Sequence, residues 1–297
     1  MPEEASMTGQ TSIVTGASRG IGFHTARALA LKGAHVVVIG HHRGRGEEAL
    51  EKIRGALADA SSVHDGSAEF ALVDLSTQDQ IRQFAESFRA EHDRLDVLVN
   101  NAGGFFLNRR ESADGIEMTL ALNHLNYFML TLLLLDLLKE TGNRKEGMAR
   151  IVNVSSEAHR GVQIHFDDIE FERRYRPMEA YGQSKLANIL FTYQLYRKLE
   201  GERVATNALH PGFVNTGFGE DHWLAGPVMK VVHFLFAKSA DEGAETPIYL
   251  ASSLEVEGVS GKYFIGKERA RSSPASYDQG TAERLWDVSE EMTGLHS

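Results

Sequence analysis

The chain has 297 residues, of which 42% are hydrophobic and 24% are charged, a balance typical of one globular domain. Its formal net charge of −10 leaves no basic stripe for nucleic-acid phosphates or anionic lipid, which disfavours DNA, RNA and membrane-surface binding. Because the chain has no cysteine, disulfides, thiolate nucleophiles and cysteine-based zinc sites are excluded.

Neither a secretory leader nor a membrane span is expected. Residues 1–10, MPEEASMTGQ, lack the basic and apolar regions of a signal peptide. The most apolar stretch, Leu125–Leu138, has 14 residues and includes Asn126, Thr131 and Asp136, whereas a spanning helix needs about 20 apolar residues. These features predict a cytoplasmic protein in which this stretch is a buried helix.

Short apolar runs alternate with amphipathic stretches along the whole chain. We expect strands at Ser12–Thr15, Ala34–Ile39, Ala68–Leu72, Leu95–Val99, Arg150–Val154, Val204–Leu209 and Gly261–Ile265. We expect helices at Ile21–Lys32, Glu47–Ala58, Gln78–His92, Asp114–Lys139, Glu179–Leu199 and Ala240–Leu250. This order predicts an α/β fold, a single doubly wound Rossmann domain with a seven-stranded parallel sheet and helices on both faces.

No repeat, low-complexity block or linker divides the chain, so residues 1–297 are predicted to form one domain. Residues 1–9 are expected to be an N-terminal tail. Residues 267–297 are expected to be a C-terminal extension with a surface helix at Gln279–Met292.

The turn between the first strand and the first helix is rich in glycine, with the sequence TGASRGIG at residues 15–22. Glycine permits unusual backbone angles and close approach of a ligand, and the following helix offers free N–H groups to a pyrophosphate. Such a cluster alone is often only a tight turn. Its place after the first strand of a βαβ unit predicts a nucleotide site.

The choice of nucleotide depends on the end of the second strand. NAD-binding folds place an acid there for the ribose hydroxyls, whereas NADP needs positive charge for its 2′-phosphate. This chain has His41, His42 and Arg43 and no acid before Glu47, and Arg19 lies in the glycine turn. The pattern favours NADP(H) over NAD(H). The alternative is that Arg43 is a solvated loop charge and that the two histidines only cap the strand.

Tyr181 and Lys185 stand four residues apart near the start of a predicted helix, which places both side chains on one face. The pKa of tyrosine is ordinarily near 10, and a neighbouring ammonium favours the phenolate. Lys185 is therefore expected to lower the pKa of Tyr181. An isolated pair at this spacing is common by chance, so other motifs have to supply the specificity.

Six motifs occur in one order: TGASRGIG at 15–22, NNAG at 100–103, Asn123, VSS at 154–156, YGQSK at 181–185 and HPGFVNT at 210–216. Together they resemble the short-chain dehydrogenase/reductase family in its shorter, non-extended form, over roughly residues 11–266. The segments NHLNYF at 123–128 and SKLANILFT at 184–192 are most similar to the retinol dehydrogenase and WW-domain oxidoreductase branch.

This resemblance implies a catalytic set. Tyr181 would be the general acid in carbonyl reduction and the base in alcohol oxidation, and Lys185 would tune it and hold the nicotinamide ribose. Ser156 would bind the reacting oxygen, because this branch places that serine 25 residues before the tyrosine, whereas Ser155 suits a strand-end cap. Asn123 would kink the long helix and anchor a proton-relay water.

The resemblance also implies the cofactor contacts. These are made by Gly16, Ser18, Arg19, Gly20, Ile21, Gly22, His41, Arg43, Asp74, Leu75, Asn101, Ala102, Gly103, Tyr181, Lys185, Pro211, Gly212, Val214 and Thr216. His41 stands where the branch commonly has arginine, which leaves the 2′-phosphate contact to Arg43 or Arg19. Asp74, taken alone, is typical of the turn that precedes a helix. The hydrophobic N-terminal anchor of the branch's membrane enzymes is not expected here.

The main alternative to an enzyme is an NADP-binding regulator of the same fold without catalysis. A zinc enzyme is disfavoured because HExxH is missing and the histidines are scattered, so no metal site is expected. The substrate is expected to be a fairly apolar carbonyl or alcohol, in a pocket shaped by residues 157–180 and by residues 218–238.

Self-association is expected from the helix at residues 123–138, which is apolar on more of its circumference than one core contact needs. The family commonly pairs this helix and the one bearing Tyr181 across a two-fold axis, which implies a homodimer or homotetramer. The alternative is that the C-terminal segment of the same chain covers this face.

Overall fold

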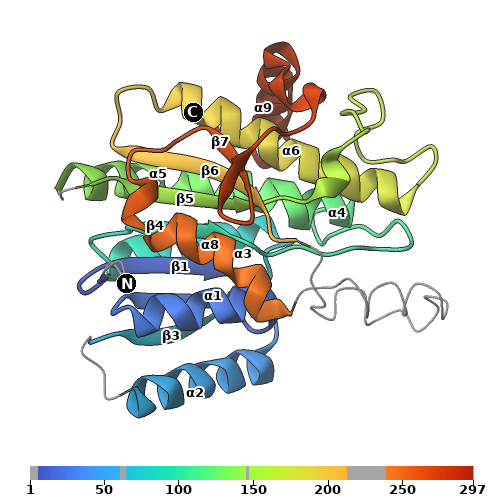
Figure 1. The fold of residues 1–297 in the computed structure, drawn as a ribbon. Helices are drawn as coiled ribbons and strands as arrows, with labels where there is room; N and C mark the ends of the chain where they lie inside the picture. Colours follow the sequence, from blue (N-terminus) through green and yellow to red (C-terminus); the bar gives the residue numbers. More distant parts are fainter. Residues whose placement is uncertain (1–5, 61–64, 145–146, 213–238, 297) are drawn as a thin grey trace.

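The computed structural model describes residues 6–60, 65–144, 147–212 and 239–296. One sheet contains β1 (Thr11–Thr15), β2 (His35–Gly40), β3 (Ser67–Leu72), β4 (Val97–Asn100), β5 (Ala149–Val154), β6 (Val204–His210), β7 (Lys262–Ile265) and β8 (Glu268–Ala270). Their order across the sheet is β3-β2-β1-β4-β5-β6-β7-β8, and the first seven run parallel (Figure 1). The Rossmann-like α/β fold predicted from the sequence is confirmed.

The strand order reverses beside β1. The chain moves outward from β1 to β3 and then returns to place β4 on the other side of β1. In doubly wound sheets a ligand binds at the carboxyl ends of the strands where this reversal opens a crevice. The ends of β1 and β4 are therefore the expected nucleotide position.

Helices cover both faces of the sheet (Figure 1). One face is covered by α1 (Gly20–Leu31), α2 (Arg43–Asp59) and α8 (Ala240–Ser252), and the other by α3 (Gln78–Glu91), α5 (Asn126–Arg144) and α6 (Pro177–Lys198). Alternate side chains of β2 enter the two cores, Val36 and Val38 beside α1 and Val37 and Ile39 beside α3. This explains why the strands are continuous apolar runs.

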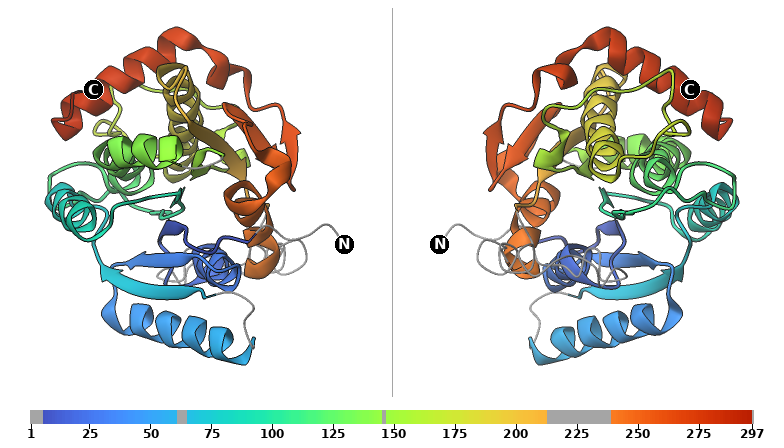
Figure 2. Two further views of the ribbon diagram at one scale, coloured as in Figure 1. Left: turned by 90° about the vertical axis from the view of Figure 1, so that its left-hand side faces the viewer. Right: turned by 90° about the vertical axis from the view of Figure 1, so that its right-hand side faces the viewer.

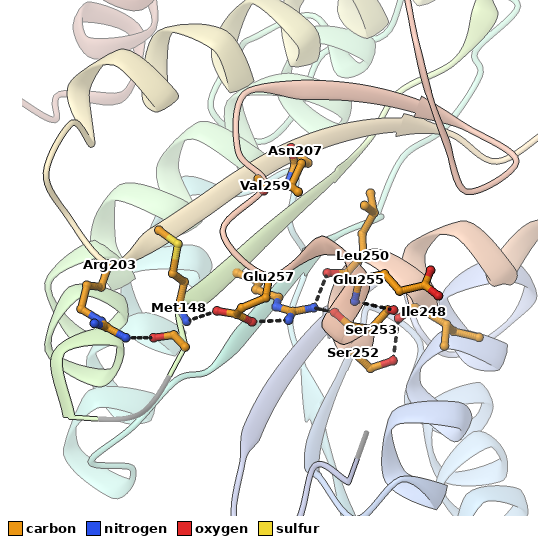
Figure 3. A network of polar contacts seen from close by, with 12 residues as sticks. Met148, Arg203, Asn207, Ile248, Leu250, Ser252, Ser253, Glu255, Glu257 and Val259 are labelled. Carbon is orange, nitrogen blue, oxygen red and sulfur yellow. Dashed lines mark hydrogen bonds and ion pairs between the residues drawn. The ribbon is translucent and has the colours of Figure 1, made fainter. Parts of the chain in front are cut away.

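A buried cation joins β5 to α8 at the amino edge of the sheet (Figure 3). Arg150 donates to the carbonyl oxygens of Leu250 and Ser253, at the C-terminal end of α8, and forms an ion pair with Glu257. The same carboxylate accepts the N–H of Met148 at 2.6 Å. A guanidinium on a helix C-terminus stabilises the negative end of the helix dipole, so this network fixes α8 against the sheet.

The prediction of seven parallel strands is wrong, because the sheet has an eighth strand, β8, antiparallel to β7. A two-residue turn joins them, with Gly266 at φ 59° and Lys267 at φ 70°. This is the backbone of a tight hairpin turn, but a lysine at positive φ is unusual and gave no turn signal. The stretch expected to begin an extension at residue 267 therefore starts inside the sheet.

The expected N-terminal tail is also shorter than residues 1–9. Met7 is buried, with 1% of its surface exposed, and its N–H donates to the carbonyl of Lys32 at 2.7 Å. This side chain belongs to the core between α1 and β2.

The long helix expected from Asp114 begins later and is irregular. It starts with α4 (Met118–Leu120), where the carboxylate of Glu117 accepts the N–H groups of Thr119 and Leu120. A π-helical turn, η1 (Ala121–Leu125), follows before α5 begins. Such turns insert one extra residue into a helix and are frequent at functional sites. Here the turn contains Asn123.

In the described part of the chain, one helix, Met118–Arg144, is long and apolar enough to cross a membrane. Of its most apolar window, 72% is buried inside the protein. The segment therefore serves as a central helix of this core.

The C-terminal helix α9 (Gln279–Thr293) lies across α6 (Figure 2). Trp286 is 3% exposed, and its ring centroid lies 4.9 Å from that of Phe128 on α5 and 5.8 Å from that of Phe191 on α6. Part of the apolar face of α5 and α6 is thus covered by α9 within one chain, as in the alternative that the sequence left open.

Candidate active site

The four residues implied as catalytic come together at the carboxyl edge of the sheet. Tyr181 and Lys185 lie on α6, Ser156 follows β5, and Asn123 lies in the π-helical turn. α6 begins with Pro177 in its first turn, so both Tyr181 and Lys185 lie inside the helix. Because they are four residues apart, their side chains lie on one face, as the spacing predicted.

Lys185 is 4% exposed, and its Nζ donates to the carbonyl oxygen of Val154 at 3.2 Å. The same Nζ lies 5.7 Å from the ring centroids of Tyr181 and Tyr127. A Cβ added to Gly103 would come within 3.5 Å of it, so the backbone there lies against the amine. Burial lowers the pKa of Lys185 to about 7.

Burial raises the pKa of Tyr181 to about 12, and a hydrogen bond with Ser156 opposes that rise. This direction differs from the lowering by Lys185 that the sequence predicted. The physical reason is that burial disfavours both the phenolate and the ammonium, so neither group acts as a fixed charge on the other. At neutral pH Tyr181 carries its proton, which suits a proton donor.

The two neighbouring serines have different partners. The Ser155 hydroxyl is buried and donates to the carbonyl oxygen of Lys185 at 2.7 Å. Ser156 begins the short helix η2 (Glu157–His159), where its Oγ accepts the N–H of Ala158 at 3.2 Å, and it is hydrogen-bonded to Tyr181. The structure therefore brings Ser156, and not Ser155, to the tyrosine.

Asn123 is held on every polar atom. Its Oδ1 accepts the N–H of Gly104 at 2.7 Å, and its Nδ2 donates to the Gly104 carbonyl and to Ser184 Oγ, both at 3.0 Å. Its backbone carbonyl accepts Asn188 Nδ2 at 2.9 Å. The π-helical turn is thereby tied to the loop that follows β4, at Gly104, and to α6.

Two buried histidines connect the segments that carry Ser156 and Asn123 to the C-terminal segment. His159 Nε2 accepts the N–H of Ser273 at 2.9 Å, so its neutral ring donates from Nδ1 to the carbonyl of Ser156 at 2.6 Å. Burial lowers the pKa of His159 and keeps the ring neutral.

His124, next to Asn123, makes the second connection. Its Nδ1 lies 3.3 Å from Asn188 Oδ1, and its Nε2 lies 3.0 Å from Ser289 Oγ on α9. Burial lowers the pKa of His124 to about 4. The sequence did not identify either histidine, because their partners in the C-terminal segment lie more than 100 residues away in the chain.

The glycine turn has the close packing of a dinucleotide cradle. A Cβ on Gly16, at φ +64°, would lie 2.8 Å from the Cα of Ala102, and one on Gly22 would lie 2.6 Å from Asn101 Nδ2. Thr15 Oγ1 accepts the N–H groups of Asn101 and Ala102 at 2.8 and 2.9 Å, which locks the ends of β1 and β4 together. These residues fit a dinucleotide, since the backbone at the start of α1 is left open to a pyrophosphate.

The other residues of the turn lie at the start of α1. Arg19 is its N-cap residue, and no side chain caps the helix there. Gly20, at φ 58°, and Ile21 open the helix. A Cβ on Gly40, which ends β2, would lie 3.3 Å from the Ser18 side chain, so the turn and the end of β2 are neighbours.

The segment after β2 is exposed and becomes helical earlier than predicted. α2 begins at Arg43, with His42 as the N-cap whose side chain accepts the N–H of Arg45. The Arg43 guanidinium lies 3.7 Å from Glu47, and 69% of its side chain is exposed. His42 therefore caps the helix, while His41 and Arg43 are free to meet solvent or a ligand.

Only some of the remaining residues implied as cofactor contacts lie in the part of the chain that the structure describes. Asp74 Oδ1 accepts the N–H and the hydroxyl of Ser76, the helix-preceding role that the sequence left open for it. Leu75 is 4% exposed, and Pro211 and Gly212, at φ 92°, follow the end of β6. Val214, Thr216 and residues 218–238 lie outside the described residues.

The segment between Ser156 and Tyr181 was expected to shape the substrate pocket, but its apolar side chains turn elsewhere. Val162, Ile164, Phe166 and Ile169 pack against the buried residues of α6 and α9. An aromatic residue that the sequence did not single out contacts Tyr181 instead. The ring of Phe105, which is partly exposed, contacts the Tyr181 ring edge-on at 5.7 Å.

Comparison with known proteins gives consistent matches. Residues 10–224 match the family model described as short chain dehydrogenase. The chain is 42% identical to retinol dehydrogenase 14 of Mus musculus, over 97% of this chain and 87% of that protein, and 39% identical to human polyprenol dehydrogenase, over 96% and 86%.

Two solved structures are similar across nearly the whole chain. A crystal structure of an uncharacterised protein from Mycobacterium Paratuberculosis has a TM-score of 0.77 and 31% identity, covering 99% of this chain and 97% of that one. The Pseudomonas aeruginosa RhlG/NADP active-site complex has a TM-score of 0.71 and 25% identity, covering 95% and 100%.

The buried, neutral His124 predicts an acid sensitivity of folding. Between pH 6.5 and about 4 the unfolded chain binds this proton and the folded protein does not, so stability falls as the pH falls through that interval. Relative to the His124→Gln variant, the wild type should lose on the order of 3 kcal/mol of unfolding free energy across it. Urea unfolding at a series of pH values measures this, with the exposed His41→Gln as control, and parallel curves for wild type and His124→Gln contradict the prediction.

Proposed function

The chain belongs to the short-chain dehydrogenase family of oxidoreductases, and from that premise we propose that it transfers a hydride between NADP(H) and a carbonyl/alcohol pair. The substrate is a fairly apolar small molecule. The observation that carries this proposal is the assembly of Tyr181, its hydrogen-bonding partner Ser156 and the buried Lys185 at one edge of the sheet.

Each protein group has one task in this proposal. The nicotinamide, when bound, supplies or accepts the hydride. Tyr181 gives its hydroxyl proton to the substrate oxygen in reduction and takes it back in oxidation. Ser156 donates a hydrogen bond to that same oxygen and holds it within reach of the phenol. The pKa of Tyr181, raised by burial, favours the acid role at neutral pH.

Lys185 is suited to switching its charge near neutral pH, since burial lowers its pKa to about 7. A charged amine beside the phenol lowers the cost of forming the phenolate after the proton has left. Asn123, fixed by residue 104 and by Asn188, keeps the segment facing Lys185 in place.

NADP(H) is the preferred nucleotide in this proposal, and support comes from the charges after β2. Arg43 is exposed and loosely paired with Glu47, Arg19 stands at the start of α1, and no acid lies at the end of β2 to bind ribose hydroxyls. The Pseudomonas aeruginosa RhlG structure, which is similar in fold, is a complex with NADP.

The names of the relatives support an apolar alcohol as the substrate class. Retinol and polyprenol are both long apolar alcohols, and the ring of Phe105 beside Tyr181 offers an apolar contact next to the reacting oxygen.

An NADP-binding regulator without catalysis is the second candidate, and the chain's complete proton-transfer pair favours the enzyme. We also propose a cytoplasmic location.

Removing one hydroxyl tests the catalytic assignment. Tyr181→Phe should lower kcat by about 10²–10⁴-fold or more, because the substrate oxygen loses its proton donor, and should leave NADPH affinity and the fold nearly unchanged. NADPH absorbance loss with a panel of apolar aldehydes and ketones measures turnover. Tyr196→Phe, on the same helix at an exposed position, is the control. Turnover of Tyr181→Phe equal to wild type overturns the assignment and favours the regulator.

Arg43 gives a test of nucleotide choice. Arg43→Ala should reduce kcat/KM for NADPH by roughly tenfold, because one charge-assisted hydrogen bond contributes about that factor. The value of kcat/KM for NADH should change little. Arg54→Ala, a matched change further along α2, should affect neither nucleotide. A wild-type enzyme that prefers NADH, or an equal loss with both nucleotides, contradicts the electrostatic argument.

A homodimer or homotetramer stays a prediction, and α9 changes where its interface has to lie. Because α9 packs on α6 and its Trp286 contacts Phe128 of α5, an interface over this part of the face would include α9. Light scattering at micromolar concentration measures the mass. A mass at twice the chain's 32.8 kDa or above supports self-association, and a mass near 32.8 kDa contradicts it.

A further inference from the structure

Three metal-ligating side chains meet at the amino edge of the sheet. His35 is the first residue of β2, Glu69 lies in the edge strand β3, and His92 ends α3. One ligand atom from each lies within 4.8 Å of the other two. The spacing of these residues along the chain gave no metal motif, because each comes from a different element.

The distances agree with a small tetrahedral ion. Glu69 Oε1 lies 3.5 Å from His35 Nε2 and 3.3 Å from His92 Nε2. Ligand atoms about 2.0–2.2 Å from a tetrahedral zinc lie about 3.3–3.5 Å from one another. The two distances to the carboxylate oxygen are thus near the separations that a shared ion imposes, and the histidine ligand atoms lie within 4.8 Å of each other.

His35 presents a ring nitrogen without a hydrogen-bond partner. Its Nδ1 is 2.8 Å from the Ser67 hydroxyl, whereas its Nε2 is buried and makes no hydrogen bond, although it faces Glu69. In the tautomer that donates from Nδ1 to Ser67, Nε2 turns its lone pair toward the carboxylate oxygen, and a metal ion between the two atoms would stabilise this arrangement. The Nδ1–Ser67 contact is the outer-shell arrangement that fixes a metal-ligating histidine.

His92 is held in place as well. Its ring stacks on the ring of Phe88 with centroids 4.3 Å apart, and the backbone N–H of His92 donates to the Phe88 carbonyl at 2.8 Å. The side chains of His35, Glu69 and His92 are 31%, 44% and 18% exposed, so an ion can reach the site and a water can complete its coordination.

We propose that His35, Glu69 and His92 bind one divalent transition-metal ion of the zinc class. Two imidazoles and a carboxylate are a set that this class prefers, and hard ions such as Ca²⁺ or Mg²⁺ prefer all-oxygen sets. The ion joins the edge strand β3 to β2 and to the end of α3. It lies at the end of β2 opposite Gly40 and the cofactor turn, about 16 Å along the strand, so its role is to stabilise the sheet edge and not to enter catalysis.

Zinc titration of the tag-free full chain tests this proposal. The wild type should bind one Zn²⁺ per chain at micromolar affinity or better, and its Tm should rise with added Zn²⁺. His92→Gln and Glu69→Gln should each weaken binding at least tenfold and remove the Tm rise. His165→Gln, which breaks a single His–Glu pair at 2.9 Å elsewhere, is the matched control and should bind as the wild type does.

A second variant separates metal binding from loss of folding. Ser67→Ala removes the hydroxyl behind His35 without touching a ligand, and should weaken Zn²⁺ binding by less than the loss of a ligand does. Co²⁺ bound to the wild type should give the visible absorption of a tetrahedral site. Absence of stoichiometric Zn²⁺ binding, or binding that persists in His92→Gln and Glu69→Gln, overturns the proposal.

Discussion

A lysine amine buried at the carboxyl edge of the sheet is the constraint around which the rest of the site is arranged. Lys185 is almost fully covered, and burial makes its charge costly, as its lowered pKa shows. The amine is tolerated because the Val154 carbonyl accepts from it and because Gly103 leaves room for it. The same burial raises the pKa of Tyr181, so one environment shifts the pKa values of both side chains.

The C-terminal segment completes this environment. His159 joins the carbonyl of Ser156 to Ser273, and His124 joins Asn188 to Ser289 on α9. Both rings are neutral because burial lowers their pKa values, so each can donate on one side and accept on the other. The C-terminal segment, whose helix was expected on the surface, therefore contacts the segments that carry Ser156 and Asn123.

Short-range sequence patterns predicted most of the fold, whereas features that depend on long-range packing were missed. The apolar runs of β1 to β7 were identified because the period of a strand is a local property. Asn123, Ser156, Tyr181 and Lys185 were named from the resemblance of short motifs to the family, and the structure brings these four residues to one edge of the sheet. The hairpin to β8 was missed because Lys267 adopts a positive φ. The π-helical turn and the covering of α5 by Trp286 depend on contacts that no local window contains.

The two edges of the sheet differ in what they contribute: one leaves groups available for ligands, and the other carries stabilising ion pairs. At the carboxyl edge, glycines and buried ionisable groups leave backbone and side chains available for ligands, which costs stability. The amino edge carries ion pairs that offset this cost: the Arg150–Glu257 network holds α8, and the buried Asp96 accepts from Arg94 and from the N–H of Thr11. A metal ion between β2, β3 and α3 would act at that same edge. The strands can thus be fixed at one end while their other ends stay open for chemistry.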